Sequence, residues 1–93
     1  MSTALERLAV YQAAVAMGIE PRHIRVHLSP GDPHGVGAHM REERKAASLS
    51  MDAVADHLDV SRPVIAYRET GKRDCWLADF HEWQDAIADL SSG

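Results

Sequence analysis

Cysteine and aromatic residues are scarce in this sequence. Cys75 is the single cysteine among 93 residues, so an internal disulfide is excluded and no thiol cluster indicates a zinc site. Aromatic residues make up 5% of the chain and hydrophobic residues 45%, so the core must consist mainly of aliphatic side chains. That composition favours packed helices over a β-sandwich, and the length suffices for one small domain.

Long apolar runs and recognisable catalytic motifs are also missing. No stretch approaches the ~20 apolar residues of a transmembrane helix, and no basic flank precedes an apolar block at the N-terminus. We therefore expect no membrane partner and an intracellular protein. The six histidines share no regular spacing with acidic residues or cysteine, so we expect no metal and no cofactor. No glycine-rich phosphate loop or linked Ser, His and Asp pattern occurs, so we do not expect an enzyme.

Basic residues do not dominate the chain, whose net charge is −4. Residues 1–39 contain three acidic and three basic residues, and residues 40–75 contain seven of each. Residues 76–93 contain four acidic residues and no basic one, which accounts for the whole excess (0 + 0 − 4 = −4). A local basic edge outside the C-terminal segment is therefore compatible with binding to nucleic acid.

The N-terminal part of the chain predicts a helix, a short ambiguous segment and a linker. Residues 3–17 read as a helix with Thr3 as cap, Glu6 completing a capping box and Gly18 at the end. Its expected inner face consists of Leu5, Leu8, Ala9, Gln12 and Ala16, with Tyr11 and Val15 at the edge. Residues 23–28 alternate as in a strand that pairs across a dimer or with another edge, but a helix opened by Pro21 is an alternative. Residues 29–38, rich in glycine and proline, predict a linker.

From residue 40 onward the pattern is helical. We expect a charged helix over 39–49, a second helix capped by Ser50, a third capped by Ser61 and ending at Thr70–Gly71, and a fourth over 77–90. The second and third helices, separated by a two-residue turn, have the helix-turn-helix pattern. The side chains expected inside are Val54, Ala55, Leu58, Val60 and Ile65, which leaves Arg62, Pro63, Ala66 and Tyr67 on the outward face of the third helix.

The segment "REERKAASLSMDAVADHLDVSRPVIAYRETGKRD", continuing into "WLADFHEWQDAIADL", resembles the phage-repressor and Cro-type (XRE) family of DNA-binding proteins. The resemblance covers residues 40–90, about half of the chain, although Asp59 and Met51–Asp52 stand where the family usually has glycine and glutamine. It implies an all-α, lambda-repressor-like helix-turn-helix domain over 40–93, behind an N-terminal extension over 1–39. It also implies a structural pair between Arg44 and Glu69.

The resemblance further implies which residues contact DNA. Hydrogen-bond readout of bases would fall to Arg62 and Tyr67, and the ring of Pro63 would touch a thymine methyl group or fill space. Ala66 and Arg68 are further possible DNA contacts. Ser61 is expected to cap its helix by accepting from the N–H of Val64. The residues expected at phosphates are Ser50, Met51, Ser61, Lys72 and Arg73.

We therefore expect a sequence-specific regulator of transcription, a phage-type or bacterial repressor that acts by operator occlusion. It would bind double-stranded DNA as a homodimer, at the nucleoid in the cytoplasm of a bacterium or of a phage-infected host cell. Residues 4–28 or the helix containing Trp83 would form the dimer surface. The main alternative is an antitoxin of a toxin–antitoxin pair, with a protein partner held by residues 4–28 and autoregulatory DNA binding. A helix-turn-helix that has lost DNA and serves only as a partner surface is a third reading.

Overall fold

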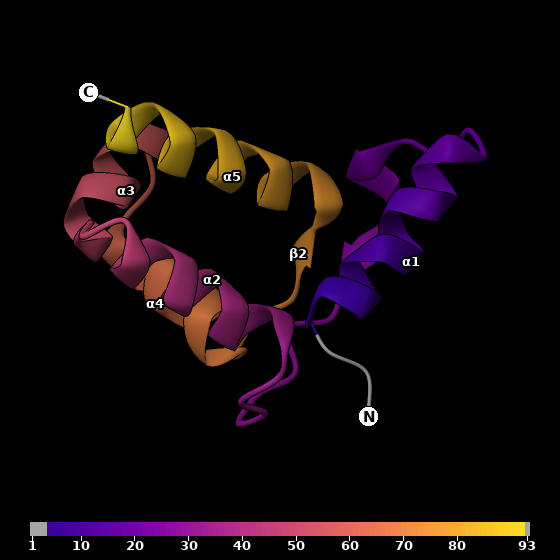
Figure 1. Ribbon diagram of the computed structural model, residues 1–93, viewed down its shortest axis with the longest axis horizontal. Coiled ribbons are helices and arrows are strands. Elements are labelled where there is room, and N and C mark those ends of the chain that lie inside the picture. The colour runs from indigo at the N-terminus through magenta and orange to yellow at the C-terminus, as the bar shows by residue number, and fades with distance from the viewer. Residues whose placement is uncertain (1–3, 93) are drawn as a thin grey trace.

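The computed structural model describes residues 4–92, and helix predominates in this part of the chain, as the composition predicted. The predicted cap Thr3 lies outside the described residues. The elements in chain order are α1 (Ala4–Ala16), the 3-10 turn η1 (Pro21–His23), β1 (Arg25–Val26), α2 (Val36–Ala46), α3 (Met51–Leu58), α4 (Arg62–Thr70), β2 (Cys75–Trp76) and α5 (Leu77–Ser91). Helix α1 lies at one end of the molecule and α3 at the opposite end (Figure 1).

Helix α3 begins and ends where its capping residues indicate. The Ser50 hydroxyl accepts a hydrogen bond from the Ala53 N–H at 3.0 Å, so Ser50 caps α3 as expected. Asp59 ends the helix in the left-handed conformation, with φ 56° and ψ 45°, and the Val60 N–H donates to the Ala55 carbonyl. Aspartate tolerates this conformation better than most residues, which explains how it can stand in the turn in place of glycine.

The N-terminus of α4 is stabilised differently from the prediction. Among the described residues the Ser61 hydroxyl makes no capping hydrogen bond; the Val64 N–H donates instead to the Ser61 carbonyl oxygen at 3.1 Å. Pro63 lies in the first turn, where backbone N–H groups have no helical partner, so its ring removes no helical hydrogen bond. The restricted φ of proline, rather than a serine cap, therefore fixes the tip of α4.

The alternating segment 23–28 combines features of both alternatives. Ile24, Val26 and Leu28 are buried, as the alternation predicts, but regular strand pairing is confined to Arg25–Val26. This strand pairs antiparallel with β2 of the same chain, with Val26 opposite Cys75. Of the two partners expected for this strand, a dimer mate or another edge, the structure has another edge within the same chain. Pro21 opens only the single turn η1, because the chain becomes extended again at Ile24.

The expected linker 29–38 is shorter than predicted, because α2 already begins at Val36. Gly37 belongs to this helix and is buried; a β-carbon there would lie 2.7 Å from the Arg68 carbonyl oxygen and 3.0 Å from that of Glu69. The glycine thus permits close contact between α2 and α4 rather than flexibility. Periodicity and turn statistics do not distinguish these two uses of glycine.

The loop before α2 is held by α1. Arg7 donates to the Ser29 hydroxyl at 2.7 Å and to an Asp32 carboxylate oxygen at 3.2 Å. The backbone N–H of His34 and then Arg7 lower the pKa of Asp32 below its ordinary value, because both stabilise the carboxylate. The loop also touches the end of α4, since a β-carbon at Gly71 would meet Pro30 at 2.7 Å.

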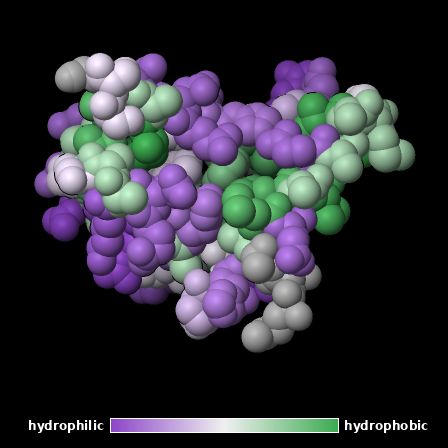
Figure 2. Space-filling model, viewed as in Figure 1, coloured by the Kyte–Doolittle hydropathy of each residue, from purple (hydrophilic) through white to green (hydrophobic). Residues whose placement is uncertain are grey.

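Helix α1 forms as predicted, but only part of its predicted inner face is buried. Ala4 and Leu8 are buried, while Tyr11, Ala14 and Val15 pack partly against the core. The expected inner residues Leu5, Ala9, Gln12 and Ala16 are exposed. The exposed large side chains of this region are Leu5 (67%), Val10 (69%), Met17 (83%) and Ile19 (47%). Figure 2 shows the resulting hydrophobic surface at the end of the molecule formed by α1.

One cluster of buried side chains connects the N-terminal segment with all later helices. Trp83 is 2% exposed and packs beside Phe80, with ring centroids 5.6 Å apart, so it belongs to this core and is not a surface anchor for a dimer. The indole N–H of Trp83 has no hydrogen-bond partner among the described residues. Across residues 4–92, none of the helices is both long and apolar enough for a membrane span.

Candidate nucleic-acid interface

The outward face of α4 carries the predicted base-reading residues. Ile65 and Glu69 are buried on its inner side, whereas Arg62, Pro63 and Tyr67 are exposed. This division follows from helical periodicity, because residues 65 and 69 lie one turn apart and residues 63 and 67 lie one turn apart on the other side. The structure therefore places the three side chains together on the solvent side of one helix.

Arg62 and Tyr67, the two residues predicted to hydrogen-bond with bases, each have a charged neighbour. The Arg62 Nε atom lies 3.8 Å from an Asp52 carboxylate oxygen, and both side chains are mostly exposed. The Lys72 ammonium group lies 5.7 Å from the centroid of the Tyr67 ring, in a cation–π arrangement. The sequence predicts a phosphate contact for Lys72, but neither its contact with Tyr67 nor the pairing of Asp52 with Arg62 was expected.

Arg68 lies on a different side of α4 from Arg62. It is half-buried, and together with Val64 it lines a hollow against the loop that leads into α5. Arg73 and Asp74 line the same hollow. Of the two basic residues that follow α4, Lys72 thus lies beside Tyr67 on the outward face of α4. Arg73 lies beside Arg68 at the hollow. Ala66 is half-buried between these surfaces and the core.

The residues at the starts of α3 and α4 that are predicted to contact phosphate differ in exposure and in hydrogen bonding. Met51 is half-buried and packs against the core, and its thioether side chain has no donor for phosphate. Ser50 and Ser61 are both exposed, but the Ser50 hydroxyl accepts a hydrogen bond in the cap of α3, whereas the Ser61 hydroxyl makes no capping bond. An exposed acidic side chain, Asp52, occupies the first turn of α3, where an anion would otherwise be stabilised by the helix N-terminus.

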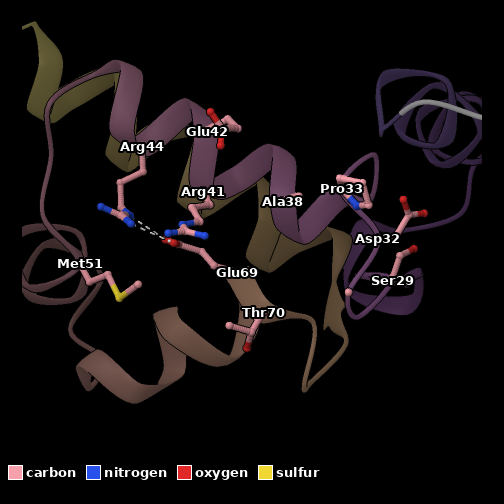
Figure 3. Close-up of a pocket in the computed structure, with 11 residues that line it drawn as sticks. Ser29, Asp32, Pro33, Ala38, Arg41, Glu42, Arg44, Met51, Glu69 and Thr70 are labelled. Carbon is pink, nitrogen blue, oxygen red and sulfur yellow. Dashed lines mark hydrogen bonds and ion pairs between the residues drawn. The ribbon is translucent and has the colours of Figure 1, made fainter.

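Arg44 and Glu69, the pair that the resemblance implies, lie in contact beneath this face (Figure 3). Arg44 Nε donates to Glu69 Oε2 at 2.7 Å, and Nη2 donates to Oε1 at 3.0 Å. Its third hydrogen bond, from Nη1, reaches the Leu49 carbonyl at 2.8 Å, just before α3. The hydrogen bonds to Glu69 raise the pKa of the Arg44 guanidinium above its ordinary value. One arginine thus links α2, the start of α3 and the end of α4.

A shallow pocket of about 610 Å³ opens beside this pair. Its lining includes Met51, Thr70 and Arg41, and in Figure 3 the Arg41 side chain extends toward Glu69 beside Arg44. Arg41 precedes Arg44 by three residues and so lies on the same side of α2. The sequence analysis overlooked Arg41, although this spacing is the signal that could have found it. No cluster of three or more metal-ligating side chains occurs in the described part of the chain.

Comparisons with known proteins give no relative. No protein-family model matches the chain, and neither the curated proteins nor the solved structures contain a significant match. We therefore infer function from the geometry of the α3–turn–α4 segment and from the sequence resemblance.

Proposed function

We propose that α3 and α4 form a Cro-type helix-turn-helix and that the protein is a sequence-specific DNA-binding regulator of transcription. The supporting observation is the two-sided character of α4. Its outward side presents Arg62, Pro63 and Tyr67, while Glu69 on its inner side is bound to Arg44. An exposed helix on a rigid base is what insertion into the major groove requires.

In this mechanism α4 enters the major groove. Arg62 donates to O6 and N7 of guanine, the commonest specific contact between protein and DNA. The Pro63 ring packs against a thymine methyl group, and the Tyr67 hydroxyl adds a hydrogen bond. Lys72, next to Tyr67, neutralises a backbone phosphate. Bound at an operator, the protein represses transcription by blocking polymerase.

A homodimer on two half-sites about 34 Å apart is the arrangement that we propose for this class of domain. The exposed hydrophobic residues of α1 and of the turn that follows it, together the α1 face, support this, because four large side chains are left in solvent there: Leu5, Val10, Met17 and Ile19. Trp83 cannot contribute, because it is buried in the core. We therefore propose residues 4–28 as the dimer surface.

The test is equilibrium binding to the DNA that flanks the gene, compared with random DNA, over a series of salt concentrations. A regulator should bind one segment far more tightly than random DNA, with an affinity that falls steeply as salt rises. Equal and weak binding to both DNAs, or no binding, would count against the proposal.

The second candidate is an antitoxin, and the same α1 face favours it. In that case the apolar surface would hold a protein partner rather than a second copy, and DNA binding would be autoregulatory. Co-purification with the product of an adjacent reading frame distinguishes the two. A partner lost on changing Val10 and Met17 to lysine, with DNA binding retained, would favour the antitoxin.

A further inference from the structure

Asp52 and Arg62 link the first turns of α3 and α4 at the edge of the proposed DNA-binding face. Asp52 is the second residue of α3 and Arg62 the first residue of α4, and a carboxylate oxygen of Asp52 lies 3.8 Å from Arg62 Nε. The two side chains remain 70% and 65% exposed. An exposed pair of this kind contributes little to folding stability, and an acidic residue in the first turn of α3 gains only a modest interaction with the helix N-terminus. Neither interaction prevents Asp52 from acting on Arg62.

Within residues 4–92, no hydrogen bond or ion pair occupies the two terminal nitrogens of Arg62. The nearest contact of Asp52 is with Nε, the inner nitrogen of the guanidinium group. The two terminal nitrogens can still form the paired hydrogen bonds that guanine O6 and N7 accept. A flexible arginine must lose rotamer freedom to make these bonds, and an ion pair at Nε reduces that loss.

The charge of Asp52 has a second consequence. A helix N-terminus ordinarily attracts a phosphate group, and the resemblance led us to expect such a contact at Ser50 and Met51. Asp52 places a negative charge there, so it repels the DNA backbone in every sequence. Only a site at which Arg62 gains its base contact offsets this repulsion.

From these observations we propose that Asp52 is a positioning residue that determines DNA specificity. Its ion pair orders the Arg62 side chain for the contact with guanine. Its negative charge weakens binding to DNA that lacks this guanine. This inference rests on the proposed DNA-binding function. Asp52 does not itself contact a base.

The experiment uses the full chain. A double-stranded DNA site is first selected from a random library with the wild-type protein. Arg62→Ala then identifies the base pair at which discrimination is lost. Affinities are measured for the selected site, for its three substitutions at that base pair and for random DNA. The variants are Asp52→Asn, Asp52→Glu, Arg62→Ala and the double variant Asp52→Asn/Arg62→Ala. Asp56→Asn is the matched control, since Asp56 is exposed on the same helix one turn further on.

We expect Asp52→Asn to bind random DNA more tightly and to lower discrimination at the Arg62 base pair by about two- to fivefold, the effect of one exposed ion pair. Asp52→Glu, which retains the charge, should keep most of the discrimination. Asp56→Asn should change affinity for all sites alike, because it removes the same charge away from Arg62. In the Arg62→Ala background, Asp52→Asn should have no further effect on discrimination.

Unchanged discrimination in Asp52→Asn, or an equal loss in Asp56→Asn, would overturn the role of Asp52 while leaving DNA binding established. Increased discrimination would overturn it too, because it would mean that Asp52 withholds Arg62 from the base. If the wild-type protein enriches no sequence at all, the proposed function fails, and the inference that depends on it fails with it.

Discussion

Arg44 and Glu69 form a buried, two-point ion pair between α2 and α4, with their side chains 9% and 1% exposed. A pair of this kind adds little net stability, because the cost of removing both charges from water offsets their attraction. It nevertheless fixes a geometry, since either charge alone would be left without a partner. Here it sets the orientation of α4 relative to α2 and to Leu49, the residue before the cap of α3.

Replacing one partner should be strongly destabilising. We expect Arg44→Ala to lower the free energy of unfolding by about 3–5 kcal/mol, because Glu69 would remain buried and unpaired. Urea denaturation measures the change. Arg22→Ala is the control, since Arg22 pairs with Glu20 at 2.6 Å on the surface and should cost at most about 1 kcal/mol. Equal effects of the two substitutions would contradict the role given to the buried pair.

A methyl group at Gly37 should disturb the contact between α2 and α4. In Gly37→Ala the new carbon would meet three backbone carbonyl oxygens at 2.7–3.1 Å, and backbone cannot move aside as a flexible side chain can. We expect a loss of about 1–3 kcal/mol by thermal unfolding, although alanine is the better helix former. Glu43→Ala, exposed on the same helix, serves as control and should stay within about 0.5 kcal/mol. Stabilisation by Gly37→Ala would show that the helices do not approach this closely.

Arg62 and Lys72 should affect DNA binding in different ways. Arg62→Ala should weaken binding to the selected operator by about 1–3 kcal/mol and affect random DNA much less, because it removes a base contact. Lys72→Ala should weaken both alike and reduce the salt dependence of binding by about one ion. The measurement is a salt series with each variant on both DNAs. Equal losses on both DNAs in Arg62→Ala would exclude a base-reading role.

The Cys75 thiol should be unreactive in the folded protein. Burial raises the pKa of the Cys75 thiol from 9.0 to about 11, so almost no thiolate is present at pH 8. A thiol-specific reagent should therefore react only when the protein is unfolded in denaturant. Rapid labelling of the folded protein at pH 8 would contradict the buried position.

The same shift makes stability depend on alkaline pH. The folded state holds the thiol proton more tightly than the unfolded state does, so this stabilisation is complete below pH 9 and is lost as the pH rises toward 11. A two-unit shift corresponds to about 3 kcal/mol at most. Cys75→Ala should lose less stability than the wild type over that interval. If the free energy of unfolding fell equally with pH in both proteins, this link between the Cys75 thiol and stability would be contradicted.

The exposed face of α1 should tolerate charge. Val10→Lys/Met17→Lys should change the free energy of unfolding by less than about 0.5 kcal/mol, because both side chains are already more than two-thirds exposed. Leu8→Ala, on the buried face, should cost about 2–5 kcal/mol.

Self-association is the second readout for this double variant. If α1 joins two copies, sedimentation should show a dimer for the wild type and a monomer for the lysine variant. A wild-type protein that stays monomeric on and off DNA would remove α1 as a dimer surface and direct attention to a different partner.

Local signals accounted for much of the helical layout. The Ser50 cap and the stop at Gly71 are short-range features, and both stand where the structure has them. The split between Ile65 inside and Tyr67 outside likewise follows from the period of a single helix. The predicted inner face of α1 was right for Leu8 but wrong for Leu5, Ala9, Gln12 and Ala16, because an alanine-rich helix has a weak pattern. Its rotation depends on contacts such as Arg7 with Ser29 and the Tyr11 hydroxyl with the His27 N–H.

By itself, then, the sequence determined which segments become helices and which side of α4 faces solvent, since both depend on neighbours within a few residues. Only the tertiary structure decided that β1 pairs with β2, that Gly37 is a packing residue, and that Asp52 lies beside Arg62. These relationships join residues 10 to 51 positions apart. The energy of such contacts depends on how whole elements pack, and no local pattern in the chain encodes that packing.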